Sequence, residues 1–193
     1  MYEIRFHGRG GQGVVLASKI LAKALVEEGK YVKAIPAFGF ERRGAPVEAF
    51  LRFDNEIVRQ FTNIYYPDCV ICIDPTLPRT VDILANLKTG GTWIQATNQS
   101  TNQIKIPEQV NKVGFCDAVG IAMKLFERPI TNSIMLGVFA KTTGLVSLKS
   151  LCHAMESVAF RDAALDKNIQ GAHRGYEETT VMESDLTKSE ETK

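Results

Sequence analysis

Residues 2–30, YEIRFHGRGGQGVVLASKILAKALVEEGK, decide the fold class of this chain. Residues 2–7 are typical of a short buried strand, and a glycine-rich segment follows at residues 8–13. Apolar residues then recur at helical spacing over Val14–Glu28, and Gly29 supplies a stop signal. A second strand is expected over residues 31–35. The stretch therefore predicts a strand–helix–strand unit at the start of the chain.

The segment between the first strand and the helix is a candidate binding loop. Gly8, Gly10 and Gly13 fit the pattern G-x-G-x-x-G, and the flanking strand and helix are the context that this pattern requires. Glycines let the backbone approach a ligand closely, and the free N–H groups of a helix start favour a phosphate. The alternative is that the glycines only permit tight packing of the strand on the helix. Phosphate contact is the favoured interpretation, and both stay open here.

A dinucleotide bound in the usual Rossmann manner is not expected. Such a site needs an acidic residue at the end of the second strand, to bind the ribose, and residues 33–37 contain none. Arg9 and Lys19 suit a more anionic group instead. Arg42 and Arg43 lie on a loop after the second strand and could bind a carboxylate or phosphate, or contact another subunit. The candidate cofactor-binding residues are Gly8, Arg9, Gly10, Gly11, Gln12, Gly13, Lys19, Arg42 and Arg43.

The rest of the chain predicts one α/β domain. The expected strands are Val47–Phe53, turned back as a hairpin at Asp54–Glu56, then Cys69–Ile73 and Thr92–Gln95, with a short helix over Arg79–Leu87. After a polar loop over residues 96–107 the chain is mostly helical, with helices at Asp117–Phe126, Thr131–Thr142, Ser147–Val158 and Arg161–Tyr176. We expect a single Rossmann-like domain over residues 1–178, with a mostly parallel sheet and a helical C-terminal third. Residues 179–193 are expected to be a disordered polar tail.

Composition excludes several classes of function. The 193 residues have a formal net charge of +1, 45% hydrophobic and 23% charged residues, so no overall field attracts nucleic acid or an anionic membrane. No segment approaches the ~18 apolar residues of a membrane span. Residues 1–7 do not resemble a signal peptide. We therefore expect a cytoplasmic protein that binds neither membrane nor nucleic acid.

The cysteines and histidines do not predict a metal or catalytic site. Cys69 and Cys72 form a C-x-x-C pair, but they lie in an expected strand, where residues three apart point to opposite faces. The sequence has no second C-x-x-C that would complete a zinc or iron–sulfur site. His7, His153 and His173 are too far apart for a metal-ligand motif. We therefore expect no catalytic residues and no metal ligands on this chain.

Five segments, in order, resemble one family over about residues 1–178. The glycine segment runs into VVLAS at residues 14–18, and the loop FGFERRGAPVEAFLR spans residues 38–52. CIDPTL at residues 72–77, TNSIMLG at residues 131–137 and NIQGA at residues 168–172, followed by Gly175 and Tyr176, complete the set. These segments resemble the gamma subunit of 2-oxoacid:acceptor oxidoreductases, the pyruvate:ferredoxin oxidoreductase gamma-type domain.

The resemblance implies a place in a larger enzyme. Members of the family decarboxylate a 2-oxoacid on thiamine diphosphate, pass electrons through iron–sulfur clusters and transfer the acyl group to coenzyme A. Thiamine diphosphate, the clusters and any FAD would be held by other subunits. The gamma chain lines the coenzyme A entry side, so the Gly8–Gly13 loop would face the coenzyme A phosphates with Lys19 as a charge partner. Arg42 or Arg43 would approach the active-site entrance.

Two hypotheses from different classes make different predictions. A gamma subunit should expose an apolar surface that needs partner chains, and should have no activity alone. A free-standing nucleotide-binding module should be monodisperse and bind a nucleotide unaided. A small dehydrogenase is disfavoured, because the ribose-binding acid and a proton-transfer residue are missing.

Overall fold

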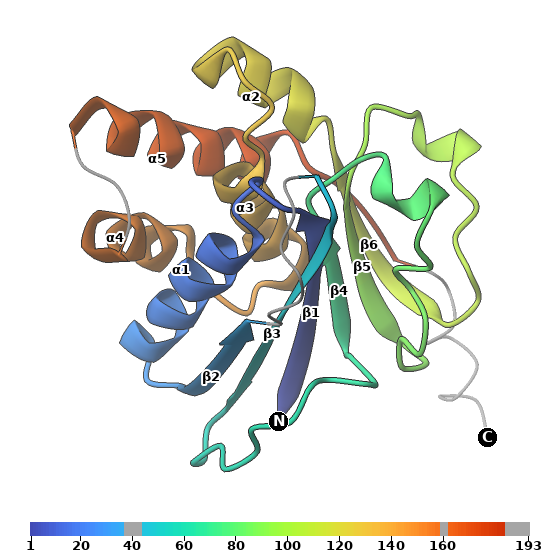
Figure 1. Cartoon of the computed structure of the whole chain (residues 1–193), viewed down its shortest axis with the longest axis vertical. Helices are drawn as coiled ribbons and strands as arrows, with labels where there is room; N and C mark the ends of the chain where they lie inside the picture. The colour runs from blue at the N-terminus through green and yellow to red at the C-terminus, as the bar shows by residue number, and fades with distance from the viewer. Residues whose placement is uncertain (37–43, 159–161, 184–193) are drawn as a thin grey trace.

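A computed structural model describes residues 1–36, 44–158 and 162–183 of the chain, which form a seven-stranded sheet and five α-helices (Figure 1). The strands are β1 (Tyr2–Arg9), β2 (Tyr31–Pro36), β3 (Pro46–Asp54), β4 (Cys69–Cys72), β5 (Gly91–Ala96), β6 (Val110–Cys116) and β7 (Thr180–Glu183). The helices are α1 (Val14–Glu27), α2 (Ala118–Phe126), α3 (Asn132–Thr143), α4 (Leu148–Val158) and α5 (Asp162–Glu177), with 3₁₀ turns η1 (Leu77–Arg79) and η2 (Thr101–Gln103). The single-domain α/β class with a helical C-terminal third is confirmed.

The sheet has a parallel centre with antiparallel strands on both sides. Its order is β2-β3-β1-β4-β5-β6-β7, and β1, β4, β5 and β6 are parallel neighbours. β3 pairs antiparallel with both β1 and β2, so β1 and β2 run in the same direction with β3 between them. The predicted opening unit is therefore present, but it is split by an inserted strand.

Each face of the sheet has its own hydrophobic core. The five helices lie on one side of the sheet, and the segments after β4 and β5 lie on the other (Figure 1). Ile4, Phe6 and Cys69 belong to the core under the helices, whereas Cys72 and Trp93 belong to the core under the connecting segments. Cys69 and Cys72 thus point to opposite faces of β4, as the sequence predicted.

Most of helix α3 is buried, and glycines let its neighbours approach closely. A Cβ on Gly137 of α3 would collide with the carbonyl oxygen of Ala172 in α5, and a Cβ on Gly175 would collide with that of Ile134. On the sheet side, Gly114 of β6 leaves room for the side chain of Thr142. The start of α3 lies beside the start of α1, because Asn132 of α3 packs against Gly13 of the candidate loop.

Four sequence expectations were wrong in detail. The segment at Asp54–Glu56 does not form a hairpin, because the strand that follows β3 is parallel to β1 and lies on its other side. The short helix expected over Arg79–Leu87 is replaced by η1 and turns. Strand β6 was missed within the part expected to be mostly helical. Thr180–Glu183, expected to belong to a disordered tail, pair with β6 as β7, and Lys112 forms an ion pair with Glu183.

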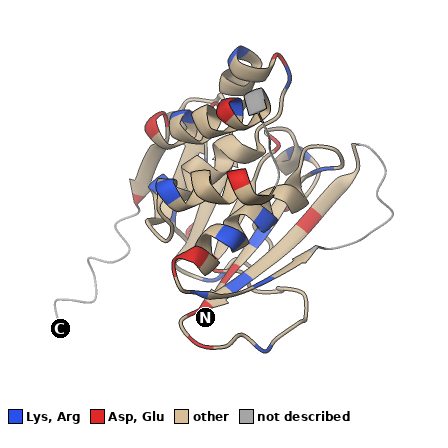
Figure 2. Cartoon of the chain, turned by 90° about the vertical axis from the view of Figure 1, so that its left-hand side faces the viewer, with Lys and Arg blue, Asp and Glu red and all other residues tan. Residues whose placement is uncertain are grey.

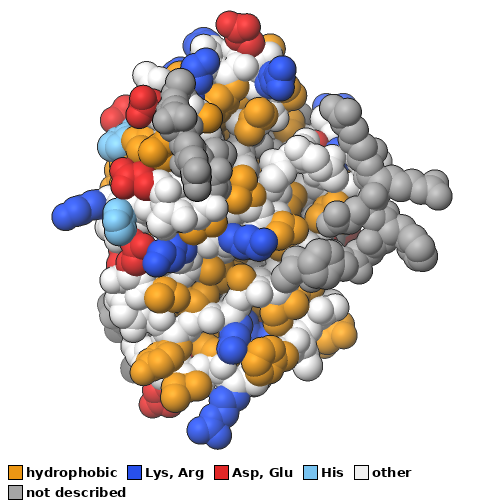
Figure 3. All heavy atoms as spheres, turned by 60° about the vertical axis from the view of Figure 1, so that its left-hand side comes forward, with side chains coloured by type: hydrophobic (Ala, Val, Ile, Leu, Met, Phe, Trp, Pro, Cys, Tyr) orange, Lys and Arg blue, Asp and Glu red, His pale blue; other side chains and the backbone are white. Residues whose placement is uncertain are grey.

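The surface has mixed charge. Figure 2 shows acidic and basic residues interspersed over the helical side, and Figure 3 shows basic side chains scattered among hydrophobic ones rather than in a stripe. Within the described residues, none of the helices is both long enough and apolar enough to cross a membrane.

His7 on β1 couples stability to pH. Its ring is buried, and Nε2 accepts a hydrogen bond of 3.0 Å from Arg5 Nε, so the ring is neutral. Burial and the neighbouring Arg5 charge lower the pKa of His7 to about 3. Because the folded pKa lies below the ordinary value near 6.5, the unfolded chain binds more protons between these values, and stability falls as pH falls through that window.

Lowering the pH from 7 to 5 should reduce the unfolding free energy of the wild-type chain. We expect this reduction to be about 2 kcal/mol larger than the one in the His7→Gln variant, which lacks the titrating ring. Urea unfolding of both proteins at the two pH values measures this difference. Parallel pH dependences in the two proteins would show that His7 is not the titrating group.

Candidate functional site

The glycine loop turns sharply between β1 and α1. Gly11 and Gly13 have φ values of 91° and 82°, a left-handed conformation that favours glycine. A Cβ on Gly8 would lie 2.6 Å from Val14 Cγ2 and 2.7 Å from Ile73 Cγ1, so this glycine permits tight packing of strand on helix. A Cβ on Gly13 would lie 2.5 Å from Asn132 Nδ2 at the start of α3.

Asp74, at the carboxyl end of β4, holds the loop in place. Its Oδ1 accepts hydrogen bonds from the Thr76 amide (2.8 Å), the Thr76 hydroxyl (2.7 Å) and the Leu77 amide (2.8 Å). Its Oδ2 accepts one from Gln12 Nε2 (2.6 Å). Burial opposes ionisation of Asp74, but the hydrogen bonds from Thr76, Gln12 and Leu77 outweigh it and lower the pKa of the carboxyl. Asp74 therefore both stabilises the turn after β4 and connects it to the glycine loop through Gln12.

Arg9 and Gln12 also tie the loop to its surroundings. The Arg9 guanidinium lies 3.5 Å from Asp74 Oδ2 and donates to the Gly44 carbonyl (3.1 Å) and the Thr76 hydroxyl (3.4 Å). The Gln12 side chain accepts from the Arg9 amide (2.7 Å) as well as donating to Asp74. A ligand that hydrogen-bonds to Arg9 or Gln12 must therefore compete with these existing partners.

The loop still presents free donors. Among the described residues, nothing accepts a hydrogen bond from the amides of Gly11 and Gly13 or of residues 14–16, whereas the Gly10 amide donates to Ala45 (2.9 Å). These amides belong to the first turn of α1, where N–H groups lack intrahelical partners. A cavity of about 370 Å³ lies beside them, lined by Gly10, Val15 and Val47 among others. The arrangement can hold an anionic group.

The other predicted residues are not gathered at the loop. Lys19 is exposed on α1, and six residues past Gly13 correspond to about 9 Å along the helix axis. Arg42 and Arg43 lie outside the described residues. The structure thus brings together Gly8–Gly13 and adds Asp74 and Thr76, which the sequence analysis did not include.

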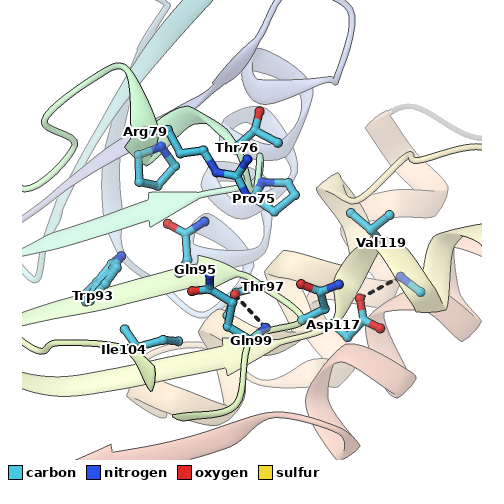
Figure 4. A pocket seen from close by; sticks show the side chains of 13 residues that line it. Pro75, Thr76, Arg79, Trp93, Gln95, Thr97, Gln99, Ile104, Asp117 and Val119 are labelled. Atoms are coloured by element: carbon cyan, nitrogen blue, oxygen red, sulfur yellow. Dashed lines mark hydrogen bonds between the residues drawn. The ribbon is translucent and has the colours of Figure 1, made fainter. Parts of the chain in front are cut away.

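A larger cavity, which the sequence analysis missed, opens at the carboxyl ends of β4, β5 and β6 (Figure 4). Its volume is about 560 Å³, and Thr76, Arg79, Trp93, Gln95 and Asp117 contribute to its walls. The signal was present in the sequence, because polar residues follow each of these strands at Asp74, Thr97 and Asp117. Ligands of open α/β sheets bind at this edge. The cavity could not be predicted without strand β6, because β6 forms one side of this edge of the sheet.

The thiols are poor nucleophiles. Burial raises the pKa of Cys72 to about 12 and that of Cys116 to about 12, and it raises the pKa of Cys69 further. Cys152 is partly exposed, and burial raises its pKa as well. In the part of the chain that the structure describes, no three His, Cys, Asp or Glu residues are placed to hold a metal ion.

The parallel strands, the glycine turn into α1 and the cavities at the carboxyl edge are features of Rossmann-like α/β domains. Comparison with known proteins is more specific. The model of the family described as pyruvate ferredoxin/flavodoxin oxidoreductase matches residues 3–178, and the chain belongs to that family.

Its relatives are subunits of 2-oxoacid oxidoreductases. The chain is 59% identical over 181 residues to the gamma subunit of NADH-dependent phenylglyoxylate dehydrogenase from Aromatoleum evansii, covering 94% of this chain and 95% of that one. It is 48% identical over 185 residues to the common gamma subunit of pyruvate/ketoisovalerate oxidoreductases from Thermococcus kodakarensis, covering 95% and 100%.

A solved structure agrees with this assignment. The crystal structure of pyruvate oxidoreductase subunit PORC from Thermotoga maritima matches with a TM-score of 0.81 and 37% identity, over 94% of this chain and 98% of that one. The resemblance inferred from the sequence is confirmed: this is a gamma-type subunit of a 2-oxoacid oxidoreductase.

Proposed function

We propose that this chain is the gamma subunit of a multi-subunit cytoplasmic oxidoreductase that converts phenylglyoxylate to benzoyl-CoA with NAD as electron acceptor. The observation that carries the proposal is the 59% identity, over nearly the full length of both chains, to the gamma subunit of NADH-dependent phenylglyoxylate dehydrogenase. The segment over residues 39–43 and the opening over residues 1–13 resemble that subunit in particular. The catalytic step belongs to other chains, which would hold thiamine diphosphate, iron–sulfur clusters and any FAD.

The second candidate is the gamma subunit of a pyruvate:ferredoxin oxidoreductase. It is supported by 48% identity to the common gamma subunit from Thermococcus kodakarensis, whose name includes pyruvate among its substrates. Both candidates share the same architecture, so the substrate has to be determined by assay of the complex.

An exposed apolar surface supports the need for partner subunits. Ile57, Phe61, Tyr65 and Tyr66, here called the 57–66 patch, are each between 62% and 69% exposed. The backbone of this segment is fixed to β3, because the buried Arg52 guanidinium donates hydrogen bonds to the Thr62 carbonyl (2.5 Å) and the Asn63 carbonyl (3.1 Å). Aromatic residues on a rigid support are favourable interface anchors, and the proposed occupant is a larger subunit of the same oxidoreductase.

The test is to isolate the chain with its partners. A tagged copy expressed in the source organism should recover larger subunits whose visible spectrum has a broad iron–sulfur band near ~400 nm. Addition of phenylglyoxylate with coenzyme A should bleach that band, and pyruvate should not. Bleaching by pyruvate and not by phenylglyoxylate would favour the second candidate. Recovery of a colourless chain without partner subunits that still binds a nucleotide would contradict the subunit proposal.

The Gly8–Gly13 loop is proposed to face the phosphates of coenzyme A, with Lys19 as a more distant charge partner and Arg42 or Arg43 near the active-site entrance. The free amides at the start of α1 and the adjoining cavity support this contact.

Gly10→Val should raise the KM for coenzyme A about tenfold, the loss expected from one charge-assisted hydrogen bond. The added side chain would narrow the space beside the free amides. Steady-state kinetics of the purified complex measure the effect, with the KM for the 2-oxoacid expected to stay unchanged. Gly29→Ala, at the far end of α1, is the control for the loss of a glycine. An unaltered KM for coenzyme A in Gly10→Val would rule the contact out.

A further inference from the structure

Two buried polar atoms in the wall of the larger cavity have no hydrogen-bond partner in the described part of the chain. They are Trp93 Nε1, a donor, and Gln95 Oε1, an acceptor. The side chains lie two residues apart on β5 and therefore point to the same face of the sheet, and their residues are 8% and 4% exposed. Nearly all buried polar groups in proteins are paired, so two unpaired atoms beside one cavity indicate a site built for a ligand.

Both atoms are held in fixed orientations. Gln95 Nε2 donates to the carbonyls of Asp74 (3.2 Å) and Ala96 (2.8 Å), which leaves Oε1 as the atom without a partner. The Trp93 ring packs edge-on against Phe115, with centroids 5.0 Å apart and an interplanar angle of 82°. A ligand that pairs with both atoms must present an acceptor and a donor.

The charged side chains around the cavity indicate where an anionic group of such a ligand would bind. Arg79 is exposed, and its guanidinium has no ion-pair partner among the residues that the structure describes. Asp117 lies elsewhere in the wall, apart from Arg79 and Thr76 in Figure 4, and it accepts a hydrogen bond from the Gly120 amide (2.9 Å) at the start of α2. An anion would therefore lie near Arg79 and away from the Asp117 carboxylate.

We propose that this cavity binds an adenosine phosphate. Adenine offers ring-nitrogen acceptors for Trp93 and an exocyclic amino donor for Gln95, while Ile104 and the indole supply apolar surface for the ring. The phosphate binds Arg79. A volume of about 560 Å³ at the carboxyl edge of parallel strands suits a ligand of this size. ADP and the nucleotide end of coenzyme A share this chemistry.

The proposal differs from the coenzyme A contact at the glycine loop. The two cavities share no lining residue. The inference does not depend on which 2-oxoacid the complex oxidises, because binding to the full chain is measured without turnover. Failure of the substrate assay and failure of nucleotide binding are thus separate results.

Trp93 is the sole tryptophan of the chain, so its emission reports directly on the cavity. Titration of the full chain with ADP should quench this emission, with a Kd on the order of 100 µM. Arg79→Gln should weaken ADP binding about tenfold, whereas Arg59→Gln, which replaces an exposed arginine outside the cavity, should leave it unchanged. IDP, which replaces the amino donor of adenine with a carbonyl acceptor, should bind about tenfold more weakly than ADP.

The outcomes separate the sources of the ligand and decide the proposal. Quenching by both ADP and coenzyme A, with none by pantetheine, supports an adenosine site that either molecule fills. Quenching by ADP alone supports a site for the free nucleotide. The proposal is overturned if ADP at several millimolar leaves the emission unchanged. Equal quenching by inorganic phosphate, equal binding of ADP and IDP, or equal loss in Arg79→Gln and Arg59→Gln would overturn it as well.

Discussion

Asp74→Ala is expected to lower the unfolding free energy of the chain by about 2–4 kcal/mol, because it removes the acceptor of four hydrogen bonds at the carboxyl end of β4. Gln12 Nε2 and the Leu77 amide would lose their partner, and the Arg9 guanidinium would lose its nearby carboxylate. The glycine loop would then lose the hydrogen bond that connects Gln12 to the end of β4. Urea unfolding at pH 7 measures the stability, and hydrogen exchange over residues 9–16 measures the order of the loop.

The control is another aspartate, Asp82, whose side chain makes few contacts. Asp82 is exposed, and its carboxylate accepts a single long hydrogen bond, of 3.2 Å from the Leu84 amide, among the described residues, so Asp82→Ala should change the unfolding free energy by less than about 0.5 kcal/mol. Asp74→Asn keeps an acceptor oxygen but loses the charge, and it should fall between the two. If Asp74→Ala is as stable as Asp82→Ala and its loop exchanges no faster, Asp74 does not organise the loop.

The double substitution Phe61→Asp/Tyr65→Asp is expected to weaken assembly with the larger subunits by at least about a hundredfold. Interface anchors of this type commonly contribute about 2 kcal/mol or more each, and a carboxylate in a desolvated contact adds a further penalty. Both side chains are largely exposed in the isolated chain, so their replacement should leave the chain folded. Co-purification with the partner subunits and thermal unfolding of the free chain measure the two properties separately.

A matched control distinguishes a specific interface from a general effect of charge. Val26 on α1 is a 50% exposed hydrophobic residue away from the 57–66 patch, and Val26→Asp should leave assembly intact. Phe61→Leu, which keeps an apolar side chain, should retain most of the binding. Normal recovery of the partner subunits by the double variant would remove the 57–66 patch from the interface.

The sequence alone determined the local features that depend on neighbouring residues. The glycine segment, the apolar periodicity of α1 and Gly29 after it were sufficient for the opening strand and helix, because turn geometry and helix periodicity are local properties. The opposite orientation of Cys69 and Cys72 followed from the two-residue repeat of a strand. The family was also recoverable, because its motifs are contiguous segments.

What only the tertiary structure decided depends on contacts between distant residues. Strand β6 was missed because its pattern is interrupted by Gly114, and the reason for that glycine is Thr142 on α3. β7 forms because β6 offers it an edge, which no local pattern within Thr180–Glu183 indicates.

In the candidate site, too, some features are local in the sequence and others depend on distant contacts. Its glycines were visible in the sequence, but the role of Asp74 depends on Gln12 and Arg9, more than sixty residues away. The cavity around Trp93 and Gln95 exists because β4, β5 and β6 are neighbours in the sheet. Periodicity and turn chemistry are encoded over a few residues, whereas strand order and side-chain partnerships are set by packing of the whole chain. For that reason the position of the glycine loop between a strand and a helix could be predicted from the sequence, and the shape and partners of the candidate site could not.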